Sequence, residues 1–135
     1  MNLVDLIRKE HDLLCRMGKM LEKENTALVN DDIASLAEIV RGKEKLNDSI
    51  RELERKRTGI CGSLSLREIA RHLKRVGKDE EADEVDALRA DMKGRISDIK
   101  RLNDTNSLLL RLSLSYVKSV LNILSPGKNM MYNHS

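Results

Sequence analysis

The chain has 135 residues, of which 35% are charged, and its formal net charge is +3. Aromatic residues make up only 1%, so the aromatic-filled core of a compact enzyme is excluded, and long helices packed along narrow seams are favoured. The 25 basic and 22 acidic residues are interspersed, which argues against a polyanion-binding tail. The N-terminus is amphipathic and charged rather than patterned as a signal peptide, so a cytoplasmic location is expected.

Apolar residues recur every three or four positions and predict a first helix from about Asn2 to Leu28 and a second from about Asp32 to Thr58. The short turn between them predicts an antiparallel hairpin. Gly59 and Gly62 are expected to bracket the end of the second helix. Four charged residues interrupt the two seams: Glu10, Glu24, Lys43 and Arg57.

Ser65 and Glu68 have the spacing of a capping box and open a short helix that ends near Gly77. This connector helix is expected to lie across the hairpin. Acidic residues at 79–81 favour the start of a last helix that runs to Leu124. The predicted fold is therefore all-α: an elongated antiparallel helical hairpin or coiled coil, a short connector helix and a long C-terminal helix. Residues 1–125 should form a single helical domain, and 126–135 a flexible C-terminal tail.

The end of the last helix carries two apolar stripes, although packing on one partner requires only one. The first stripe consists of Leu102, Leu109, Tyr116, Val120 and Ile123, with Asn106 and Ser113 set into it. The second consists of Leu110, Leu114, Val117, Leu121 and Leu124. Charge is sparse here, yet Arg111, Lys118 and several serines make the stretch a poor membrane span. The surplus stripe predicts a contact surface.

No group of residues suggests catalysis or a cofactor. His11 has no second histidine one turn away, and neither Cys15 nor Cys61 has a metal-ligand spacing or an identifiable base. His72 lies among basic residues and His134 in the tail, so both are interpreted as surface histidines. No catalytic residue, metal ligand or cofactor is therefore expected. The basic segment 67–78 is a candidate nucleic-acid contact, but without aromatic residues it is better interpreted as a solvated helix face.

The C-terminal stretch resembles a family pattern. Asn106-x-x-Leu109-Leu110-x-x-Ser113-Leu114-x-Tyr116-Val117, followed by Leu121, Leu124 and a tail with Tyr132, is similar to the C-terminal signature of the FlgN family of flagellar export chaperones. The resemblance implies a cytoplasmic, all-helical protein. It also implies binding to the C-terminal helical segments of the hook–filament junction proteins FlgK and FlgL, and their delivery to the flagellar type III export gate.

The combined hypothesis is a helix-in-groove contact on the surplus stripe. Its candidate partner-binding residues are Leu109, Leu110, Leu112, Leu114, Tyr116, Val117, Val120, Leu121 and Leu124. For any one of them, packing on the first two helices is the alternative. Asn106 and Ser113 are expected to fix helix register, or alternatively to orient a bound peptide. A structural coiled-coil protein that only forms a homodimer remains the alternative function.

Overall fold

The computed structural model describes residues 2–124, and within that range it contains four helices and no strand. The helices are α1 (Leu3–Val29), α2 (Ile33–Cys61), α3 (Leu66–Arg75) and α4 (Asp79–Leu124). The prediction of an all-α fold with a hairpin, a short helix and a long last helix is confirmed. The tail at 126–135 lies outside the described residues.

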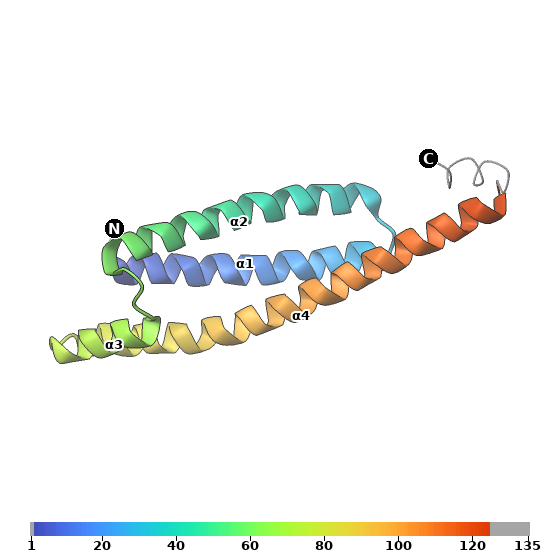
Figure 1. Cartoon of the computed structure of the whole chain (residues 1–135). Helices are drawn as coiled ribbons and strands as arrows, with labels where there is room; N and C mark the ends of the chain where they lie inside the picture. The colour runs from blue at the N-terminus through green and yellow to red at the C-terminus, as the bar shows by residue number, and fades with distance from the viewer. Residues whose placement is uncertain (1, 125–135) are drawn as a thin grey trace.

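Helix α1 is the centre of the molecule, because α2 and α4 both pack against it (Figure 1). Helix α2 returns antiparallel to α1, whereas α4 runs in the same direction as α1 and continues past the α1–α2 turn. Helix α3 packs against the start of α4. The expectation that the short helix lies across the hairpin is therefore wrong, because the apolar stripe of α3 packs chiefly against α4.

The helix boundaries follow local capping chemistry. Asp32 is the N-cap of α2 and its carboxylate accepts a hydrogen bond from the Ser35 backbone N–H at 3.2 Å. The capping box of Ser65 and Glu68 is present at the start of α3, as predicted. Helix α2 runs through Gly59 and stops only at Gly62, which has a φ of 62°. The helix therefore ends between Gly59 and Gly62, as expected, but Gly59 itself does not stop it. One glycine is tolerated inside a helix, whereas a residue with positive φ ends it.

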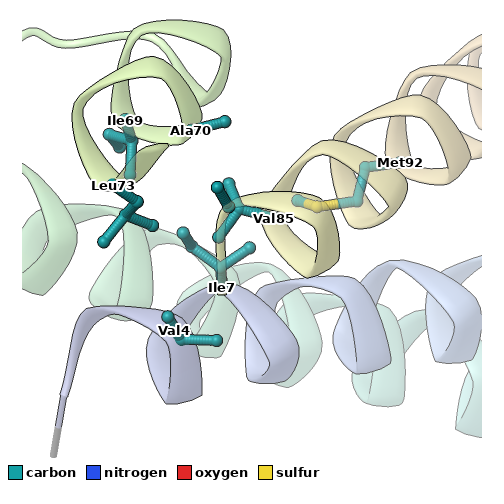
Figure 2. Close-up of a cluster of buried hydrophobic side chains, with 8 residues drawn as sticks. Val4, Ile7, Ile69, Ala70, Leu73, Val85 and Met92 are labelled. Atoms are coloured by element: carbon teal, nitrogen blue, oxygen red, sulfur yellow. The ribbon is translucent and has the colours of Figure 1, made fainter. Parts of the chain in front are cut away.

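Two apolar clusters hold the helices together. The larger lies where the first turns of α1 and α4 meet α3, and Figure 2 shows its side chains converging from these three helices. Its buried members are Val4, Ile7, Ile69, Ala70, Leu73, Ala82, Val85 and Met92. The second cluster joins all three long helices nearer the α1–α2 turn and has Met17, Leu21 and Leu46 at its centre. Both clusters end before the last turns of α4, so within residues 2–124 these turns belong to neither of them.

Two buried acidic side chains of α1 pair with bases of α2. Glu10 accepts a hydrogen bond from Arg57 Nε at 2.7 Å, and Lys43 Nζ lies 3.1 Å from Glu24 Oε2. The two acids and the two bases are each two heptads apart, so an antiparallel register satisfies both pairs at once. Burial raises the pKa of the Glu10 carboxyl even though Arg57 favours its ionised form. The charges that interrupt the seams therefore align the hairpin.

Candidate partner-binding groove

Asn106 is the last buried residue of α4 within the described range. Its Nδ2 donates to the Leu21 carbonyl oxygen and to Glu24 Oε1, each at 2.9 Å, and its Oδ1 accepts from Asn25 Nδ2 at 3.0 Å. Both polar ends of the amide are thus satisfied on α1. An alternative position of α4 along α1 would leave these buried groups unpaired, at a cost of about 1–3 kcal/mol for each group.

Lys43 extends this polar network to α2. Its Nζ binds the same Glu24 carboxylate and also lies 3.5 Å from Asn103 Oδ1 on α4. One lysine therefore links all three long helices immediately before α4 leaves the hairpin. The network fixes where the anchored part of α4 ends.

Beyond Asn106, α4 exposes apolar residues of both stripes and between them. Leu109, Ser113 and Val120 are half-buried. The exposed apolar residues are Leu108, Leu110, Leu112, Leu114, Tyr116, Val117, Leu121, Ile123 and Leu124. Exposed apolar surface that is contiguous rather than scattered marks an interaction site. None of the nine candidate residues is fully buried, and seven of them are exposed; Leu109 and Val120 are the two that are half-buried.

A groove of about 600 Å³ lies between α4 and the α1–α2 turn. Helix α4 contributes Leu109, Leu110, Leu112, Ser113, Leu114, Tyr116 and Val117 to its lining. The turn and its flanking helix ends contribute Ala27, Leu28, Asp31, Asp32, Ile33 and Leu36. Six of the nine candidate residues meet in this groove, whereas Val120, Leu121 and Leu124 lie farther along α4 and do not line it.

The sequence interpretation missed the wall of the groove that the α1–α2 turn supplies. Ile33 is exposed at the first turn of α2, and Asp31 adopts a left-handed φ of 54° in the turn itself. The sequence contains one signal for this wall, because the apolar residue Ile33 directly follows Asp31 and Asp32 at the start of the second helix. Nothing in the periodicity showed that α4 would pass this turn, because that depends on α1 and α4 running in the same direction.

The two register candidates have different surroundings. Asn106 makes the three hydrogen bonds described above, which is the arrangement expected of a register-fixing residue. Ser113 is half-buried in the groove wall, and within residues 2–124 its side chain makes no hydrogen bond. Both roles stay hypotheses, and the hydrogen bonds favour register fixing for Asn106 and leave peptide orientation for Ser113.

A family profile described as FlgN protein matches residues 1–135 of this chain. The chain belongs to the FlgN family. Membership indicates a flagellar export chaperone, and this is a chaperone family rather than one of enzymes. No curated protein sequence and no solved structure gives a significant match.

The other candidate residues of this FlgN-family chain lie outside the lining of the groove. The basic face of α3 shares a shallow depression with Asp83 and Asp86 of α4, so its positive charge is locally offset. Cys61 donates to the Arg57 carbonyl oxygen and His72 is exposed, while His134 lies outside the described residues. His11 and Cys15, however, lie together with Asp91 of α4, which their spacing in the sequence did not reveal.

One helix within residues 2–124, α4, is long and apolar enough to cross a membrane by length and composition. One such helix is weak evidence for a membrane span, and the apolar end of α4 contains the charged residues Arg111 and Lys118. A groove-lining function explains the same composition, because six of its apolar residues line the groove.

Proposed function

We propose that this protein is a cytoplasmic chaperone of flagellar type III export that binds the C-terminal helical segments of FlgK- and FlgL-type hook–filament junction proteins. It delivers them to the export apparatus. The single observation that carries the proposal is the apolar groove between α4 and the α1–α2 turn. The family relationship supports the chaperone class, and the groove supplies a surface on which a client segment can be held.

The groove suits an amphipathic helix. Its α4 wall presents apolar residues at spacings of three and four, such as Leu110, Leu114 and Val117, and helix-in-groove recognition uses the same spacing. The opposite wall carries Asp31 and Asp32 beside apolar Ile33. A client helix can therefore bury its apolar face while basic residues at its edge meet the acidic side of the groove.

Release of the client follows from folding on binding. A client segment that is disordered alone and becomes helical in the groove spends free energy on ordering, which lowers the affinity per unit of buried area. Such a complex is specific and still releasable at an export gate.

Calorimetric titration with synthetic C-terminal peptides of FlgK- and FlgL-type proteins tests the proposal. We expect saturable binding with a negative heat-capacity change, because apolar surface is buried. Hydrogen exchange should show protection of the Leu109–Val117 segment in the complex. A folded protein that binds neither peptide would refute the proposed client class.

The alternative is a structural coiled-coil protein that pairs through the same stripe. It is supported by the exposed heptad-like spacing of Leu110, Leu114, Val117 and Leu124. Sedimentation over a range of concentrations separates the two functions. A homodimer that stays intact and excludes both client peptides would favour the structural protein, whereas dissociation on peptide addition would favour the chaperone.

A further inference from the structure

His11, Cys15 and Asp91 bring three different metal-ligating side chains together on the side of α1 that faces α4. His11 and Cys15 lie one turn apart on α1, with Cys15 Sγ 3.9 Å from His11 Nε2. Asp91 Oδ2 forms a hydrogen bond with the same Nε2 from α4. All three donor atoms lie within 4.8 Å of one another. His11 and Cys15 are half-buried, and Asp91 is at the exposed edge.

The donor set is one that Zn²⁺ accepts. Zinc binds imidazole nitrogen, thiolate sulfur and carboxylate oxygen at about 2.0–2.3 Å, so neighbouring donors of a tetrahedral site are about 3.3–3.6 Å apart. The Cys15–His11 separation is within about 0.5 Å of that spacing. The contact between His11 and Asp91 is closer than the spacing, because a hydrogen bond now joins them, and it opens when an ion takes the place of the proton.

We propose that His11, Cys15 and Asp91 form a Zn²⁺ site that joins α1 to α4, with water as the fourth ligand. The charge balance is favourable, because one thiolate and one carboxylate neutralise the ion. Arg95 Nε already donates to Asp91 Oδ2 at 2.7 Å, so it must move to the other carboxylate oxygen before Oδ2 can bind the ion, and its positive charge weakens the site. The site lies on the anchored part of α4, outside the lining of the groove, and is independent of the client-binding proposal.

Titration of the reduced, untagged full chain with Co²⁺ tests the site, because cobalt takes zinc-like geometry and reports its ligands in the absorption spectrum. We expect a single equivalent to bind with a sulfur-to-cobalt charge-transfer band, and Zn²⁺ to displace it. Cys15→Ser should abolish the band and weaken binding at least tenfold, since loss even of an outer-shell partner costs 10- to 100-fold.

Cys61→Ser is the matched control, because Cys61 is the other half-buried thiol and bonds only to a backbone carbonyl. It should leave the band and the affinity unchanged. Asp91→Asn keeps the size of the side chain and should weaken binding tenfold or more while the thiolate band persists. Zn²⁺ should raise the thermal unfolding midpoint of wild type and not that of Cys15→Ser.

Two results would overturn the site. One is a chain that binds no Co²⁺ while its circular dichroism shows it folded, which would leave the cluster as a hydrogen bond between α1 and α4. The other is a charge-transfer band that survives Cys15→Ser or disappears in Cys61→Ser.

Discussion

Leu110, Leu114 and Val117 form the exposed edge of the groove, and replacing all three with alanine tests whether that edge binds the client. Their exposed fractions are 43%, 61% and 52%. About half of the apolar surface that the substitutions remove lies in water in the free protein. The complex should lose the burial of this exposed half, in addition to any stability that the free protein itself loses.

The magnitude follows from the exposed fractions. Complete burial of a Leu or Val side chain contributes about 1.5–3 kcal/mol. Since about half of each side chain is still exposed, and alanine retains one methyl group, the three substitutions together should remove roughly 2–4 kcal/mol of binding free energy. This corresponds to a rise in the client Kd of roughly 30- to 1000-fold. Calorimetry with a FlgK- or FlgL-type C-terminal peptide measures it directly.

The chain offers a matched control elsewhere on its surface. Val40, Ile60 and Val76 are 42%, 56% and 54% exposed and none lines the groove. Their triple alanine variant removes a comparable area, so it should bind the client within about twofold of wild type, since exposed substitutions away from the contact change free energies by about 0.5 kcal/mol or less. Equal weakening by both variants, or none by the groove variant while it remains helical, would refute the assignment of the groove.

Three further predictions concern the anchored part of the fold. Arg57→Ala leaves the Glu10 carboxylate buried and unpaired, so urea unfolding should show a loss of about 3–5 kcal/mol. Because burial holds the pKa of Glu10 above 4.5, ionisation costs the folded state more than the unfolded chain. The stability of wild type relative to Glu10→Gln should therefore fall as pH rises from about 4.5 through the raised pKa, and a rising difference would contradict this. Asn106→Ala should cost about 1–3 kcal/mol, whereas Ser113→Ala, which breaks no hydrogen bond within residues 2–124, should cost less than about 0.5 kcal/mol.

The sequence was sufficient for the elements whose signals are local. Helix periodicity and the capping box at Ser65 each depend on residues within one or two turns of each other, and each is present in the structure. The packing partner of α3 was not predictable in this way. Its stripe can close on any apolar seam, and the choice of α4 depends on the chain reversing at Gly77, where φ is 84°.

The candidate site was also predictable only where its signals lie within one helix. Periodicity identified the surplus stripe of α4, because both stripes are visible within one helix. The second wall of the groove and the cluster of His11, Cys15 and Asp91 require the direction and register of α4 along α1. The pairing of Glu10 with Arg57 and Glu24 with Lys43 was present in the sequence as equal spacings. Periodicity within one helix does not reveal it, because the two acids lie on α1 and the two bases on α2.

Asn106 also explains why α4 is able to present an apolar surface without losing it to the hairpin. If α4 moved along α1 by one turn toward the core, its apolar residues would gain contacts, but Asn106 would lose its partners on Leu21, Glu24 and Asn25. The cost of several unpaired buried polar groups, about 1–3 kcal/mol each, exceeds the gain from half-burying one more leucine. A polar residue at the last buried position thus keeps the stripe in water, where a client can reach it.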